Sequence, residues 1–341
     1  MTNVGPIGKE LAAAGVEVHE LKMGRGRLSP LGLLRMVRIL RRSRPCLLHC
    51  WMYHANLLGL VAGKLARISG IIWSIRCSEV DFSYYRPLTR WVVWISALLS
   101  RFAGIIIVNS EAGRRVHETL GFAASKMVVI PNGIDSERFK PNDLARSSVR
   151  AELRISEDKL LIGLIARFDP MKDHATFFQA AGRLSKRNQD VHFVLAGSEI
   201  CAENAALCRM ICENCLQDSV HLLGLREDIA RLTSALDIAS LSSQAEAFPN
   251  VVGEAMACGV PCVVTDVGDS AYIVAETGLV VQPKDPEGLA AGWATLIGMG
   301  KGTRQALGWR ARKRIQDNFS VEMLVRKHVE LYEKLLSLLS T

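Results

Sequence analysis

The sequence has no apolar run long enough to cross a lipid bilayer. Its strongest apolar stretches, residues 91–99 and 105–108, stop well short of the about 20 residues that a membrane-spanning helix needs. The chain opens with Met-Thr-Asn-Val-Gly-Pro, which does not resemble the apolar core of a secretory leader. We therefore expect a cytoplasmic protein, with peripheral contact at the inner face of the membrane as the alternative.

Metal-binding spacings are missing as well. The nine cysteines are scattered, and the pair Cys212 and Cys215 near Cys208 does not recur downstream. His221 has no partner at zinc spacing, and no Asp-x-Asp motif is present. Reduced, buried cysteines are the expected state, and we expect neither a metal site nor a bound cofactor.

The sequence also lacks any helix-turn-helix, zinc-finger or RNP-like motif, so nucleic acid is not an expected partner. The net charge of +8 is nevertheless uneven. Residues 1–145 hold 20 Lys and Arg against 10 Asp and Glu, whereas the rest of the chain holds 22 against 24. Much of the excess is Arg35, Arg38, Arg41, Arg42 and Arg44. These arginines form either a solvated helix face or a surface for anionic lipid or a phosphate-bearing acceptor.

What the sequence does contain is an alternation of short apolar runs and helix-length segments. With 341 residues, of which 49% are hydrophobic, the chain is long enough for two α/β domains. Such alternation predicts parallel sheets with helices on both faces. The expected strands are residues 17–21, 47–49, 71–75, 105–109, 127–130, 160–166, 192–196, 220–223, 238–241, 261–265 and 278–281.

The alternation pauses once, between about residues 131 and 156, where Pro and Gly interrupt the pattern. The change from basic to neutral composition falls at the same place. We therefore predict a first domain at residues 1–143 and a second at 144–318. A C-terminal amphipathic helix at 319–341 is expected to pack back toward the first domain.

The segment from Glu246 to Pro261 carries the richest chemistry. Asn250 is predicted to cap a helix that begins at Val251 and ends at Gly259. A helix N-terminus that follows a strand binds anions, because its free N–H groups point outward. Glu254, one turn into this helix, can accept hydrogen bonds from vicinal hydroxyls, or it can simply complement the helix dipole.

A second segment follows the strand that ends at residue 166. Arg167 is placed at the carboxyl end of this strand, and Lys172 follows a turn at Pro170. Two cations at the mouth of a parallel sheet can neutralise a diphosphate without a metal ion. The alternative is that both are ordinary surface cations.

Together these segments resemble the retaining GT-B glycosyltransferases of the glycogen-synthase-like class, also called glycosyl transferases group 1. The Glu-x7-Glu spacing of Glu246 and Glu254 is the hallmark of that class, and the run from Arg167 to His174 is similar to its diphosphate clamp. Further matches are Asn109-Ser-Glu111, the segment Val129-Ile-Pro-Asn-Gly-Ile-Asp135, and Gly278 with Pro283, Asp285 and Pro286. The resemblance covers the chain from about Val4 onward. It implies a GT-B fold, in which two Rossmann-like, doubly wound parallel-sheet domains face a cleft.

The resemblance also implies roles for single residues. Glu254 binds the donor ribose, Arg167 and Lys172 hold the diphosphate, and Glu246 contacts the transferred sugar. The donor cradle is expected from Phe248, Pro249, Asn250 and Val251, and the base site from Leu223, Gly224 and Leu225. In the first domain His54 is the expected active-site histidine, with His49 and Arg76 as weaker candidates.

The implied reaction moves a hexosyl group from a nucleoside diphosphate sugar, UDP- or GDP-linked, to an acceptor hydroxyl with retention. A carbohydrate or lipid-linked acceptor in surface polysaccharide or glycolipid synthesis is expected. One feature departs from the class, whose members begin with a strand and a glycine-rich turn upstream of the position of Val4. We therefore expect a first domain truncated at its start. The alternatives are a non-catalytic sugar-nucleotide-binding protein and, among enzymes, a phosphorylase or epimerase.

Overall fold

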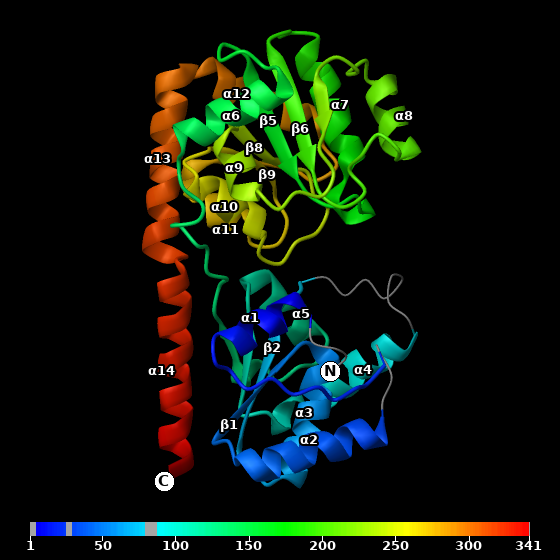
Figure 1. The fold of residues 1–341 in the computed structure, drawn as a ribbon, viewed down its shortest axis with the longest axis vertical. Coiled ribbons are helices and arrows are strands. Elements are labelled where there is room, and N and C mark those ends of the chain that lie inside the picture. Colours follow the sequence, from blue (N-terminus) through cyan, green and yellow to red (C-terminus); the bar gives the residue numbers. More distant parts are fainter. Residues whose placement is uncertain (1–4, 25–28, 79–86, 341) are drawn as a thin grey trace.

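The computed structural model describes residues 5–24, 29–78 and 87–340, so the predicted point of entry at Val4 lies outside the described residues. Two parallel sheets organise the chain, one above the other in Figure 1. The first sheet has the strand order β1-β2-β3-β4, and the second has the order β10-β9-β8-β5-β6-β7. Helices flank both sheets, and the predicted α/β class is confirmed.

The two inner strands of the first sheet are short, isoleucine-rich runs that are buried on both faces, as expected for parallel strands, whereas its two edge strands are partly exposed. The central strand β2 is buried along its whole length. The elements of this half are α1 (Pro6–Ala13), α2 (Pro30–Ser43), β1 (Leu47–Trp51), α3 (Tyr53–Leu65), β2 (Gly70–Ile75), α4 (Pro87–Leu99), β3 (Ile105–Val108), α5 (Glu111–Thr119) and β4 (Met127–Val129).

The second sheet carries a core on each face, formed by two clusters of buried apolar side chains. Its elements are α6 (Asp143–Leu153), β5 (Leu160–Ile165), α7 (His174–Ser185), β6 (Val191–Ala196), α8 (Ala205–Glu213), β7 (Val220–Leu222), α9 (Ile229–Ser234), β8 (Ile238–Leu241), α10 (Asn250–Ala257), β9 (Cys262–Thr265), α11 (Ser270–Val274), β10 (Leu279–Val281) and α12 (Pro286–Gly298). Several helices begin at the side-chain caps that their sequences supply, such as Asn142, Asp173 and Asp285.

One predicted strand is wrong. Residues 17–21 lie in neither a strand nor a helix, and their two apolar residues, Val18 and Leu21, are three positions apart and do not alternate. Leu21 is buried next to Met23 and Leu58, so this segment packs on the helices of the first half instead of joining a ladder. A short segment with a few apolar residues can be buried against helices as well as in a sheet, and the sequence alone does not separate the two.

The C-terminal helices join the two halves along one side of the molecule (Figure 1). Helix α13 (Gly300–Asn318) packs on α10, and α14 (Val321–Ser340) turns back to the first sheet. Leu335 of α14 is buried against Ile72, Ile107 and Ile130. At the crossing, the Ile134 N–H donates to the Phe319 carbonyl at 2.7 Å. The predicted domain limits at 143 and 318 stay a prediction.

Trp293 of α12 is fully buried and anchors one core of the second sheet. Its ring lies 5.2 Å from that of Phe177 and 5.9 Å from that of Phe193, measured between centroids. We predict that Trp293→Ala lowers the free energy of unfolding of the second half by about 3–5 kcal/mol, because it opens a cavity there.

Urea unfolding followed by circular dichroism measures this change. Trp94→Ala is the matched control, because Trp94 is 59% exposed and its removal opens no cavity. Equal losses in both variants would contradict the assigned core role of Trp293.

Candidate active site

An ion pair joins the loops that follow two neighbouring strands of the second sheet. Lys172, after β5, places its Nζ 2.5 Å from Oε1 of Glu246, after β8. The Ser243 hydroxyl donates to the same carboxylate oxygen at 2.8 Å. The loops are further tied by the Gln244 N–H, which donates to the Met171 carbonyl at 2.8 Å. Both partners are mostly buried, so the sheet holds this pair in a fixed position.

Arg167 also follows β5, as predicted, but its side chain remains 63% exposed. Its guanidinium donates from Nε to the Asp169 carboxylate at 2.9 Å. Asp169 in turn accepts from the Met171 N–H at 2.9 Å and caps the short turn that leads to Lys172. The two predicted cations therefore stand on one structured turn, and each is already paired with a carboxylate.

Helix α10 begins directly after the Glu246 loop and ends at Ala257, before Gly259 in the left-handed conformation. Burial raises the pKa of Glu254 above its usual value, while the positive charge of Arg138 opposes that shift. Phe248 is buried at the approach to the helix, and Pro249 is the residue before its first turn. The segment thus presents a helix N-terminus, with half-buried Val251 in its first turn, beside the loop of Glu246.

The predicted cap is wrong in one detail. Pro249 occupies the cap position, Asn250 is the first helical residue, and no side chain caps α10. The Asn250 side chain is engaged elsewhere, since its Oδ1 accepts from Nδ2 of Asn132 at 2.7 Å. Asn132 also accepts from Arg76, which follows β2 of the first sheet. A contact between distant parts of the chain therefore replaces the local cap.

Leu223, Gly224 and Leu225 follow the edge strand β7. Gly224 has a positive φ of 65°, its carbonyl accepts from Gly197 and its N–H donates to Ile200, at 2.8 and 2.7 Å. Leu225 is 79% exposed beside this turn. The turn is thus anchored to the loop after β6, which is next to the strand that leads to Arg167.

The histidines of the first sheet lie at β1. His49 is within the strand, where its ring bonds the Tyr332 and Ser74 hydroxyls at 2.8 and 2.7 Å. Burial, together with His328 and Arg76, lowers its pKa to about 4, so the ring is neutral at pH 7. His54 is half-buried at the second position of α3, just beyond the strand. Within the described part of the chain, no hydrogen bond joins His54 to the second sheet.

Comparison with known proteins assigns each half of the chain to a family model. Residues 6–138 match the model of the Glycosyltransferase Family 4, and residues 159–299 match that of the Glycosyl transferases group 1. The two models together cover most of the chain and both describe glycosyltransferases. The chain belongs to the GT-B glycosyltransferases.

Individual relatives are similar over a large part of this chain. EpsF of Bacillus subtilis (strain 168), which carries a glycosyltransferase name, is 32% identical over 68% of this chain and 60% of its own length. The N,N'-diacetylbacillosaminyl-diphospho-undecaprenol alpha-1,3-N-acetylgalactosaminyltransferase of Campylobacter jejuni is 28% identical over 76% of this chain and 70% of its own. The chain thus spans between three fifths and seven tenths of these two proteins.

Solved structures share the fold. Anabaena Alr3699/HepE in complex with UDP and glucose superposes with a TM-score of 0.82, over 97% of this chain and 89% of that one, at 22% identity. A glycosyltransferase from Rickettsia africae gives a TM-score of 0.83 at 20% identity, over 97% and 88% of the two chains. At these identities the likeness establishes the GT-B fold alone.

The interface between the two sheets of this GT-B chain depends on a residue that the sequence did not single out. Asp269, only 3% exposed, accepts from the N–H groups of Glu111 and Ala112 at 2.8 and 3.0 Å. Its carboxylate thereby caps α5 of the first half from the second half, in addition to the local Ser110 cap. Nearby, the Ser78 hydroxyl donates to the Glu246 carbonyl. Such contacts leave no signal in a local pattern, because the partners are more than 150 positions apart.

We predict that Asp269→Ala frees the first turn of α5 from the second half. Loss of a charged cap at a helix N-terminus is worth roughly 1–2 kcal/mol, so hydrogen exchange at residues 111 and 112 is expected to rise about tenfold. Exchange followed by mass spectrometry measures this. The matched control is Asp285→Ala, which removes a cap within the second half, on α12. Unchanged exchange at α5 in the Asp269 variant would contradict an interface role.

Proposed function

We propose that this chain transfers a hexosyl group from a nucleoside diphosphate sugar to an acceptor hydroxyl. The observation that carries the proposal is the pair formed by Lys172 and Glu246 beside the start of α10. At the carboxyl edge of the second sheet, this arrangement brings together a cation that can bind a phosphate, a carboxylate that can bind sugar hydroxyls and the N-terminus of a helix. Relatives whose names describe glycosyl transfer, and solved neighbours bound to UDP-sugars, support the same function.

In this proposal Arg167 and Lys172 hold the diphosphate, and Glu254 accepts the ribose hydroxyls. Glu246 binds the transferred sugar, the backbone from Phe248 to Val251 cradles it, and the turn at Leu223 and Gly224 receives the base. His54 is the proposed first-domain contribution to catalysis. The developing charge on the leaving diphosphate is stabilised by the two cations and the N-terminus of α10.

We further propose retention of configuration and independence from divalent metal. In such a mechanism the acceptor attacks the face from which the diphosphate departs, and the departing phosphate takes its proton, so no protein nucleophile is needed. Among the described residues, no group of three or more acidic, histidine or cysteine side chains is arranged to hold a metal. Product anomer analysis, with and without a chelator, tests both points. The alternative, a sugar-nucleotide-binding protein without activity, predicts donor binding without transfer or hydrolysis.

The acceptor proposed is a carbohydrate or a lipid-linked one, because two relatives are named for diphospho-undecaprenol acceptors. Helix α4 supports contact with a membrane surface. Its outer face is apolar, with Leu88, Trp91, Trp94 and Leu98 each between 48% and 62% exposed. Tryptophan is favoured at membrane interfaces, and the arginines of α2 add positive charge near α3, on which both helices pack. No helix in the described ranges is long and apolar enough to cross a membrane.

Donor binding is the first prediction of this function. In a calorimetric panel of UDP, GDP and ADP sugars without added metal, one nucleotide class is expected to bind, and Glu254→Gln is expected to weaken it at least about tenfold. The glutamine keeps the packing but removes the charged acceptor of the ribose hydroxyls. Glu276→Gln, at an exposed position of the same half, is the control. Unchanged affinity in the Glu254 variant would place the ribose elsewhere.

Membrane contact is the second prediction. Replacing both Trp91 and Trp94 with Ser is expected to reduce co-sedimentation with vesicles rich in phosphatidylglycerol several-fold, because the apolar face of α4 is lost. Trp309→Ser, which removes a tryptophan that is 59% exposed on the second half, is the matched control. Equal sedimentation of all three proteins would refute this docking face.

A further inference from the structure

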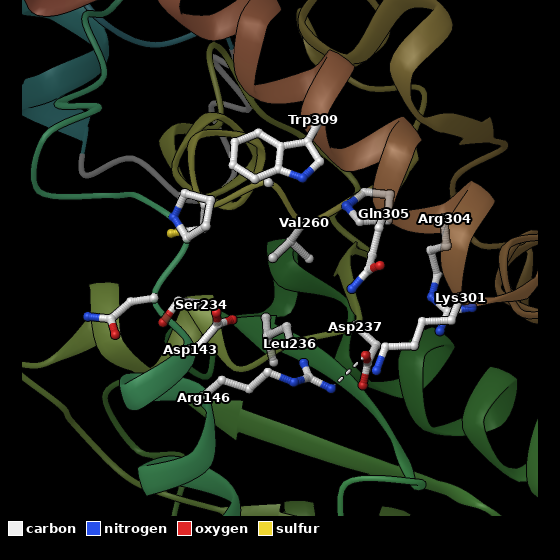
Figure 2. Close-up of a pocket in the computed structure, with 15 residues that line it drawn as sticks. Asp143, Arg146, Ser234, Leu236, Asp237, Val260, Lys301, Arg304, Gln305 and Trp309 are labelled. Carbon is white, nitrogen blue, oxygen red and sulfur yellow. Dashed lines mark hydrogen bonds and ion pairs between the residues drawn. The ribbon is translucent and has the colours of Figure 1, made fainter.

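A pocket of about 250 Å³ lies in the second half, at the edge of the sheet opposite the candidate active site. It is bordered by the start of α6, the residues just before β8 and β9, and the first turns of α13. Figure 2 shows Lys301, Arg304, Gln305 and Trp309 reaching over it from α13, with Asp143 and Arg146 on the other side. The pocket adjoins the C-terminal end of α10, whereas the proposed donor site uses its N-terminus. Eight helical residues separate the two sites by about 12 Å.

The decisive feature of this pocket is Arg304. The residue is only 6% exposed, and its guanidinium makes one hydrogen bond within the described chain, from NH1 to the Leu296 carbonyl at 3.3 Å. No carboxylate of the described residues lies within ion-pair distance of it. Arginines with so little exposed surface normally pair with a carboxylate, so one that has no such partner and borders a pocket is unusual.

Arg150, in the same half of the chain, shows how a buried arginine is normally paired. It is 1% exposed and donates to the Asp237 carboxylate at 2.6 Å and to two backbone carbonyls. Arg304 also has little exposed surface but no such partner. None of its guanidinium nitrogens is among the buried, unpartnered atoms of the described residues, so its remaining donors are open to the pocket that it lines. The pocket therefore presents an uncompensated, preorganised cation.

The other residues that line the pocket indicate which chemical groups a ligand would carry. Asp237 does not neutralise the pocket, because Arg146 and Arg150 both already pair with it, at 2.9 and 2.6 Å. Lys301 stands one helical turn before Arg304 and adds a second cation. Asp143 and Gln305 supply groups that bond hydroxyls, and the exposed ring of Trp309 offers a flat apolar face.

We propose that this pocket binds a small phosphorylated sugar, separately from the donor site. The guanidinium of Arg304 and the ammonium of Lys301 take the phosphate, since a planar guanidinium matches phosphate oxygens. Asp143 and Gln305 take hydroxyls, and the ring lies against Trp309. The volume, just below the about 300–1,000 Å³ of pockets for drug-sized ligands, suits a phosphorylated monosaccharide.

The test is a calorimetric titration with glucose 6-phosphate, with glucose and inorganic phosphate as partial probes. Glucose 6-phosphate is expected to bind the unaltered protein more tightly than either probe. Lys301→Gln and Trp309→Leu, both at exposed positions that tolerate replacement, are each expected to weaken it about tenfold. Arg304→Gln is expected to abolish binding where the variant folds.

Two controls separate this site from others. Lys313→Gln makes the same charge change at an exposed position of α13, outside the pocket, and is expected to leave affinity unchanged. Arg167→Gln alters the proposed donor site and is also expected to leave it unchanged. No saturation by glucose 6-phosphate, equal affinity in the Lys301 and Trp309 variants, or loss with Arg167→Gln would each overturn the proposal.

Discussion

All strands of the two sheets run parallel to their neighbours, and this constraint decides where chemistry can occur. The loops after β5 and β8 must leave the second sheet at one edge, which places Lys172 against Glu246 although they are 74 positions apart. The loops after β2 and β3 leave the first sheet at its own carboxyl edge. There Arg76 bonds Asn132, and the start of α5 meets Asp269. Both carboxyl edges thus meet at one interface.

Much of this arrangement follows from the sequence, because burial on both faces forces near-continuous β-branched runs. Ten of the eleven expected segments coincide with observed strands, from β1 to β10. The exception at residues 17–21 joins no sheet and packs on α2 and α3. Hydrophobic periodicity reports that a side chain is buried, and it does not report which element covers it.

The sequence predicted where the residues of the candidate site lie relative to the strands, but it did not predict their hydrogen-bond and ion-pair partners. A glutamate eight positions before another, and two cations after a strand, are local signals. The hydrogen bond of Asn250 is not local. Its side chain was expected to cap α10, but it accepts a hydrogen bond from Asn132 instead. Arg304 shows the same limit in a sharper form. The sequence around Arg304 is that of an ordinary polar helix. Only the fold shows that this residue has little exposed surface and that no carboxylate of the described residues pairs with it.

The Lys172–Glu246 pair has a consequence for how a donor would be recognised in the proposed function. Both proposed phosphate cations are already neutralised, Lys172 by Glu246 and Arg167 by Asp169. A phosphate that arrived alone would compete with Glu246 for Lys172 and leave a mostly buried carboxylate without its partner, which is costly. A sugar nucleotide avoids that cost, because its hydroxyls donate to Glu246 while its diphosphate takes Lys172. The ion pair therefore couples recognition of the sugar to recognition of the phosphate, and it favours the complete donor over its fragments.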